Sequence, residues 1–151
     1  MINRIPVMVV SMMVMTPHGS WHRPPRAWQA DVLVQALEIT EPKRGGPLGT
    51  HVVVAVQSDD EARAVRIEIL LPIGVGVLRM PTGCHPSPSP VTSLNARVTC
   101  DLGDIPVRGS RDVSITTTGR AATGPLRVAV FAVSDTPDPL PANNFAEKVL
   151  P

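Results

Sequence analysis

At 151 residues the chain has room for one domain, and its 43% hydrophobic content is enough to bury a single core. Its 17 prolines and 11 glycines are too many for a helical bundle and suit short strands joined by turns. The formal net charge is only +1, and the arginines are scattered among acids, so the clustered basic surface that nucleic acid requires is excluded.

The first thirty residues differ in composition from the rest of the chain: they hold both tryptophans, five of the six methionines and no acidic residue. A short positive start precedes an apolar run, Ile5–Met15, and a polar stretch, Thr16–Ala30, that ends in a small residue. This pattern predicts a signal peptide and processing segment over residues 1–30, cleaved after Ala30 or near Gly19 or Ser20. The run is shorter than the roughly 20 apolar residues of a membrane helix, so no membrane span is expected in the mature chain.

From Asp31 onward, apolar and polar residues alternate with a period of two, which is typical of strands with one buried face. In Arg63–Leu71 the pattern is clearest, since Val65, Ile67 and Ile69 all point to one side. Leu126–Val133 is apolar on both faces, which favours a place in the middle of a sheet. The expected strands are 32–38, 51–57, 63–71, 74–80, 95–101, 111–118, 126–133 and 145–150.

These short strands are separated by loops rich in proline and glycine, and no internal repeat is visible. In the first strand, Val32, Val34 and Ala36 are expected to share a face. Seven or eight strands at this spacing predict an all-β fold, an immunoglobulin-like antiparallel β-sandwich of about seven strands that occupies residues 31–151.

Short matches to a known family follow one another along the chain: Leu71-Pro72 with Gly74, Cys84, Cys100 in Val-Thr-Cys, Leu102-Gly103, Gly109, Asp138-Pro139 and Asn143-Asn144. With this order, the stretch from about Asp31 to Leu150 resembles the bacterial immunoglobulin-like module called domain of unknown function eleven, the conserved repeat domain of surface proteins. The sequence departs from the family pattern at His51–Val53 and Gln57–Asp60. The resemblance implies a surface module, and because a single copy is present, a stalk of tandem copies is not carried over.

Cys84 and Cys100 are the only cysteines, an even number in a chain expected to be exported, and a disulfide between them is the plain interpretation. Closing a loop of this size should stabilise the fold by about 3 kcal/mol. The alternative is a metal site or a reactive thiol formed with His85. Zinc needs four ligands, or three and a water, and adjacent strand side chains point to opposite faces, so this alternative is disfavoured.

Asp135, Asp138, Asn143 and Asn144 offer oxygen ligands within ten residues, which is the kind of set that calcium uses. Asp and Asn also form turns by hydrogen-bonding to nearby backbone, so a rigid corner explains them equally. They are weak calcium candidates only, and no metal or cofactor is expected. Asp59–Glu61 is interpreted as a solvated acidic turn.

Nothing in the sequence indicates a catalytic site. No Gly-x-Ser-x-Gly elbow is present, although a triad assembled in space stays open. Sugar platforms use exposed Trp or Tyr, whereas this chain has no Tyr, and past Asp31 only Phe131 and Phe145, both in apolar strands, are aromatic. The four histidines lie apart, at His18, His22, His51 and His85.

The sequence therefore predicts a non-enzymatic extracellular, cell-surface or periplasmic module that acts as a structural spacer or a protein-interaction domain, using sheet edges or loops. The alternative is a small calcium- or ligand-binding extracellular protein that uses the Asp135 to Asn144 corner. A third hypothesis is a cytosolic protein with reduced cysteines, in which Met1–Met15 packs as an ordinary strand or helix. No nucleic-acid partner is expected in any of these cases.

Overall fold

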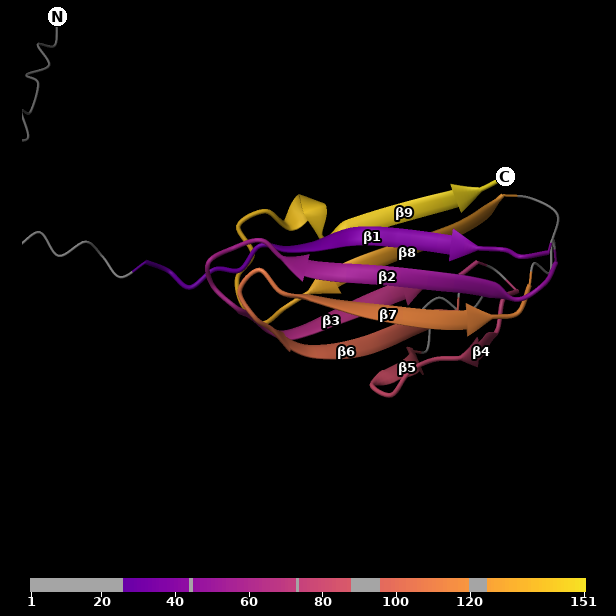
Figure 1. Cartoon of the computed structure of the whole chain (residues 1–151), viewed down its shortest axis with the longest axis horizontal. Coiled ribbons are helices and arrows are strands. Elements are labelled where there is room, and N and C mark those ends of the chain that lie inside the picture. Colours follow the sequence, from indigo (N-terminus) through magenta and orange to yellow (C-terminus); the bar gives the residue numbers. More distant parts are fainter. Residues whose placement is uncertain (1–25, 44, 73, 88–95, 120–124) are drawn as a thin grey trace, which may run out of the picture.

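The protein forms two antiparallel sheets (Figure 1). The computed structural model describes residues 26–43, 45–72, 74–87, 96–119 and 125–151. Sheet A has the strand order β1-β2-β7-β4, and sheet B has the order β5-β6-β3-β8-β9. In this part of the chain no helix has the length and apolar character needed to cross a membrane. The elements are β1 (Val32–Thr40), β2 (Leu48–Val56), β3 (Ala62–Leu70), β4 (Val77–Arg79), β5 (Cys84–Ser87), β6 (Arg97–Ile105), β7 (Ser110–Thr117), β8 (Leu126–Val133), the 3-10 turn η1 (Pro141–Asn143) and β9 (Phe145–Leu150).

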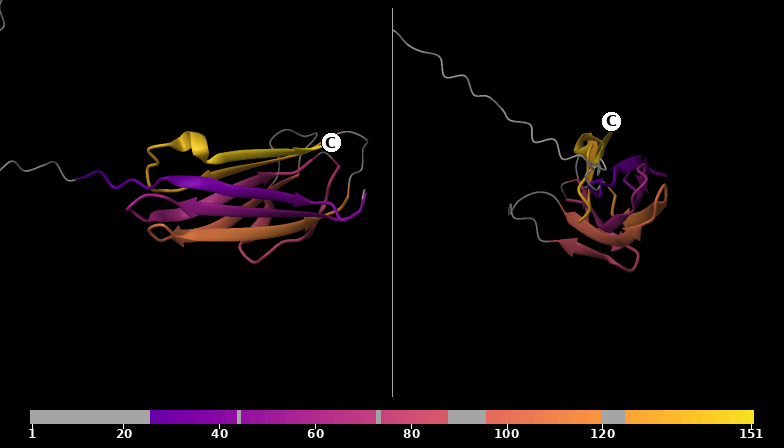
Figure 2. Two further views of the ribbon diagram at one scale, coloured as in Figure 1. Left: turned by 45° about the horizontal axis from the view of Figure 1, so that its top comes forward. Right: turned by 90° about the vertical axis from the view of Figure 1, so that its left-hand side faces the viewer.

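The two sheets lie face to face over one core, which confirms the predicted β-sandwich (Figure 2). In sheet A, β2 lies between β1 and β7, and in sheet B, β8 lies between β3 and β9. These are the neighbour relations of strands A, B, E and C, F, G in immunoglobulin domains. The architecture is therefore immunoglobulin-like, with β6 and the short edge strand β5 beside β3 in sheet B and the short strand β4 at the edge of sheet A.

The core consists of aliphatic side chains supplied by alternate residues of both sheets. Val65, Ile67 and Ile69 of the central strand β3 are completely buried, as their period-two spacing predicts. Among the described residues, the buried hydrophobic side chains are those of Ala, Val, Ile, Leu and Cys100, without any aromatic ring. β-branched residues suit this role because they fill a pleated surface with few rotamers to lose.

Several details of the strands differ from the prediction: β2 begins at Leu48, inside the predicted loop, β4 is limited to Val77–Arg79, and β6 continues to Ile105. In β1 a bulge between Val34 and Ala36 shifts the register against β2, so Leu37 rather than Ala36 continues the core face. The predicted loop after Pro81 contains β5, which pairs with β6 at the edge of sheet B. A bulge and a four-residue edge strand both depend on contacts with a distant strand, so a local alternation pattern does not indicate them.

The chain enters the sandwich through a short N-terminal segment, Trp28–Asp31, that docks between the loops at one end (Figure 1). Ala30 is completely buried and belongs to the core. The N–H groups of Gln29, Ala30 and Asp31 donate to Asp60 Oδ2 (3.1 Å), the Pro137 carbonyl (3.0 Å) and Ser58 Oγ (3.1 Å), respectively. The folded unit therefore includes residues that the sequence analysis assigned to the processing segment, of which residues 1–25 lie outside the described part.

The burial of Ala30 gives a direct test of where the domain begins. Ala30→Leu adds atoms where no space remains, and we expect the free energy of unfolding to fall by about 1–3 kcal/mol in urea denaturation. Ala27→Leu, at an exposed position of the same stretch, is the matched control and should leave stability unchanged. Equal stability of the two variants would place the start of the folded domain after Ala30.

Candidate functional site

The predicted disulfide is present and lies within sheet B. Cys84 on β5 and Cys100 on β6 are directly opposite each other, with Cα atoms 3.9 Å apart. Because both sulfurs are bonded, neither is available as a metal ligand or a nucleophile in this state. His85 points to the opposite face, beside Thr99, so the structure does not combine it with the cysteines.

The bond attaches an edge strand to its sheet and does not join the two sheets, unlike the B–F disulfide of antibody domains. β5 is only four residues long, and none of its residues is fully buried. A hydrogen bond of 2.6 Å between Ser87 Oγ and Thr99 Oγ1 also connects its side chains to β6. The disulfide therefore holds in place a strand that contributes little to the core.

Of the four calcium candidates, Asp138 holds the backbone at the corner between β8 and β9. Both carboxylate oxygens of Asp138 accept backbone hydrogen bonds, from Val32 N (3.0 Å) and from Leu140 N (2.7 Å). Asp135 instead lies 3.5 Å from the guanidinium of Arg66, at the surface. Asp138 thus ties the corner to the first residue of β1, which agrees with the interpretation of a rigid turn.

The two asparagines of the corner contact the N-terminal segment or are enclosed by protein. Asn143 Nδ2 donates to Asp31 Oδ1 (2.8 Å), whereas the Oδ1 atoms of Asn143 and Asn144 are buried without a hydrogen-bond partner. Both asparagine residues are partly buried. In the described part of the chain, no three His, Cys, Asp or Glu side chains gather as a metal-binding group.

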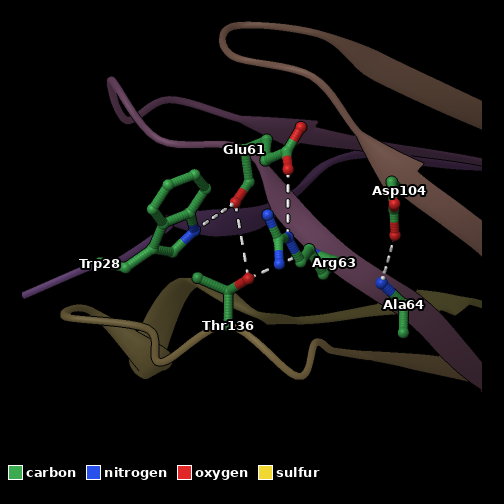
Figure 3. A network of polar contacts seen from close by, with 6 residues as sticks. All are labelled: Trp28, Glu61, Arg63, Ala64, Asp104 and Thr136. Atoms are coloured by element: carbon green, nitrogen blue, oxygen red, sulfur yellow. Dashed lines mark hydrogen bonds and ion pairs between the residues drawn. The ribbon is translucent and has the colours of Figure 1, made fainter.

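The acidic turn and the N-terminal segment form one polar network (Figure 3). Trp28 Nε1 donates to the Glu61 carbonyl (3.2 Å), and the Arg63 guanidinium lies 5.0 Å from the centre of the indole ring. The backbone N–H of Arg63 donates to Thr136 Oγ1 (3.0 Å), which connects β3 to the corner. Asp59–Glu61, predicted as a solvated turn, is thus the surface on which the entering chain docks.

Across sheet A the strand register brings together a histidine, a carboxylate and a hydroxyl that are far apart in sequence. His51 Nε2 on β2 lies 3.5 Å from Asp112 Oδ2 on β7, and Ser114 is the cross-strand neighbour of His51. The two side chains of the ion pair are 40% and 73% exposed, so water screens their interaction. Within the described contacts Ser114 does not hydrogen-bond to His51, which an activated serine requires.

The outer face of sheet B carries an exposed aromatic pair. Phe131 on β8 and Phe145 on β9 are cross-strand partners with ring centroids 4.8 Å apart, and they are 41% and 44% exposed. On the same face lie Val133 and Val149, which are also exposed, and Ala129. We call these five residues the Phe face. β8 is central in its sheet, as predicted, but its second apolar side is open to solvent.

Arginine–carboxylate ion pairs surround the Phe face. Each joins an arginine to a carboxylate on this outer side of sheet B or at the end of β8: Arg127–Glu147, Arg66–Asp135 and Arg97–Glu68. The rim is therefore electrically balanced, and the apolar centre is the distinctive feature. The sequence contained a signal for this site, since Leu126–Val133 is apolar on both faces while only one face can meet sheet A.

Comparisons with protein-family models and with curated proteins find no match for this chain. Among solved structures it is similar to BslA, a bacterial hydrophobin, at 13% identity and a TM-score of 0.46, over 82% of this chain and 93% of that one. A cohesin module of a family 33 glycoside hydrolase from Clostridium perfringens has 10% identity and a TM-score of 0.47, over 82% and 96% of the two chains. A family GH18 chitinase from Chromobacterium violaceum has 13% identity and a TM-score of 0.39, over 75% of this chain and 19% of the chitinase.

Reduction of the disulfide should destabilise the domain without unfolding it, because β5 lies at an edge. We expect the free energy of unfolding to fall by about 3 kcal/mol, measured by urea denaturation with and without a dithiol reductant. The variant with Cys84→Ser and Cys100→Ala should match the reduced protein and should not respond to the reductant. Loss of the β-sheet circular dichroism signal on reduction alone would contradict this assignment.

Asp138→Ala should lower the free energy of unfolding by about 2 kcal/mol, because two backbone N–H groups lose a charged acceptor. The decrease should be the same with and without millimolar calcium. Asp135→Ala is the matched control: its exposed ion pair should contribute less than about 1 kcal/mol. A calcium-dependent rise in melting temperature that disappears in Asp138→Ala would instead support a cation site at the corner.

Proposed function

We propose that this chain is a non-catalytic β-sandwich module that is exported to the cell surface, the periplasm or the medium and contacts another protein through the Phe face. The observation that carries the proposal is the exposed pair of tilted, contacting rings of Phe131 and Phe145 on a sheet whose other face forms the core. Phenylalanine rings are enriched at protein interfaces, and contiguous exposed apolar patches mark interaction sites.

The chemistry around the rings favours a protein surface over a carbohydrate. The adjacent side chains of the Phe face are Ala129, Val133 and Val149, which offer no hydrogen bonds to sugar hydroxyls. Arginine–carboxylate pairs at the rim are typical of the polar border of a protein interface. A passive spacer does not require exposed aromatic rings, so the Phe face favours a binding role over a spacer role.

Two further features support export. The disulfide between Cys84 and Cys100 is of a kind that persists in oxidising compartments and is rare in the cytosol. The resemblance to the conserved repeat domain of surface proteins points the same way. These two features support the export of the chain, whereas the Phe face supports its binding role.

The proposal is tested by photo-crosslinking in the native host. A photoreactive phenylalanine analogue replaces Phe131 in one strain and Leu78 in another; Leu78 is 59% exposed and lies on β4 of sheet A. We expect an adduct of defined mass from position 131, recovered outside the cytoplasm, and none from position 78. A chain confined to the cytoplasm with two free thiols, or equal adducts from both positions, would contradict the proposal.

A further inference from the structure

We propose that the partner of the Phe face is a second copy of this chain, packed face to face across a two-fold axis. This inference rests on the proposed function, since it names the protein that covers the Phe face. It follows from the positions that the strand register assigns to the apolar and charged residues of sheet B.

Four of the five residues of the Phe face are arranged symmetrically about one row, and Val149 lies outside this pattern. Phe131 and Phe145 stand side by side in this row, which runs across the strands. Ala129 and Val133 lie two residues to either side of Phe131 on β8. A two-fold axis along the row superposes each ring on its own copy and sets Ala129 opposite Val133 of the second chain. A small and a larger side chain then meet, which is the complementarity that packed faces require.

Two sets of arginine and aspartate around the row have the same symmetry with opposite signs, whereas Arg66 and Glu147 have no opposite charge at the symmetric position. Arg127 and Asp135 lie four residues to either side of Phe131, so the axis sets each arginine opposite the other chain's aspartate. On β6, Arg97 and Asp101 lie two residues to either side of Thr99, which is in the row. The axis therefore forms two kinds of arginine–aspartate contact, each occurring twice.

Among the residues of the row, Glu68 is the one whose contact with its own copy is repulsive, because two like charges meet. Glu68, between Thr99 and Phe131, meets Glu68 of the second chain, but each carboxylate is already 3.2 Å from its own Arg97. Twist between the packed sheets displaces the outer contacts sideways, and arginine is the side chain long enough to follow them.

The edges of sheet B are less suitable for self-association than its face. On the edge strand β9, Lys148 is paired with the core residue Val128, so its side chain points inward between the sheets. An inward-pointing charge on an edge strand is a device by which natural sheets prevent edge-to-edge pairing. At the opposite edge β5 is short and contains Pro86, which cannot donate a ladder hydrogen bond.

The size of the face limits the strength of the complex. Four strands spaced about 4.8 Å apart and about eight residues long give a face of roughly 20 by 25 Å, or about 500 Å² in projection. Stable complexes bury about 800 Å² per partner, so a weak dimer is expected, with association in the range of about 10 µM to 1 mM. Weak association of this kind suits a surface that assembles only where copies are concentrated.

The test is sedimentation analysis of the chain recovered from its host, from about 1 µM to 1 mM. We expect a monomer–dimer equilibrium whose dissociation constant rises at least about tenfold in Phe131→Ser and Phe145→Ser, since buried aromatic residues dominate interfaces. Leu78→Ser, at a more exposed apolar position on sheet A, is the matched control and should leave the constant unchanged. Melting temperatures of all variants verify that each is folded.

A charge exchange tests the orientation. Arg127→Asp should weaken the dimer several-fold, and adding Asp135→Arg in the same chain should restore it, because positions 127 and 135 then attract again across the axis. Within one chain the double variant disrupts the pairs with Glu147 and Arg66, so recovery cannot come from intramolecular contacts. Absence of recovery would overturn the two-fold arrangement.

The other outcomes separate this inference from the proposed function. A monomer at every concentration, or a dimer that Phe131→Ser leaves unchanged, overturns self-association through the Phe face. If the crosslink from position 131 then joins a different extracytoplasmic protein, the proposed function stands and only the identity of the partner changes. If position 131 forms no adduct either, both fail.

Discussion

Packing of β-branched side chains between two sheets is the interaction on which the rest of this structure depends. Val65, Ile67 and Ile69 of β3 are completely buried, and they meet valines and isoleucines of β2 and β7 across the sandwich. Burial of such side chains contributes about 1.5–3 kcal/mol each, which is large against the net stability of a domain. Because aliphatic residues fill this core, the two phenylalanines are not needed inside and remain on the outer side of sheet B.

The end of the sandwich where the chain enters shows how polar residues support that core. Asp60 and Asp138 accept hydrogen bonds from the backbone N–H groups of Gln29 and Val32, which would otherwise be unsatisfied where the chain enters the sandwich. The Asn143 side chain donates to the Asp31 carboxylate. In sequence, such a group of residues resembles a calcium site, because Asp and Asn are both common calcium ligands and common turn-forming residues. Here the structure uses them to close one end of the core over Ala30.

Much of the fold follows from local sequence, and the remainder depends on long-range contacts. The period-two pattern located β3, β7 and β8 within a residue or so, and the even number of cysteines indicated the disulfide. The pattern did not reveal the bulge in β1 or the strand β5, because both are defined by register against another strand. The neighbours Phe131–Phe145 and His51–Asp112 likewise exist only once strands are paired, so sequence alone gave the residues but not the pairs.

The position of the disulfide has a mechanical consequence. The chain enters the sandwich at one end and leaves β9 at the other, so a pull between its ends loads the domain along its length (Figure 1). Cys84 and Cys100 are 16 residues apart, and an extended segment of that length spans about 55 Å. While the bond is intact, the segment between the two cysteines cannot extend under tension. A stretched domain therefore lengthens less, and β5 and β6 remain together. A thiol reductant would release that hidden length, which makes the extensibility of the module depend on the redox state of its surroundings.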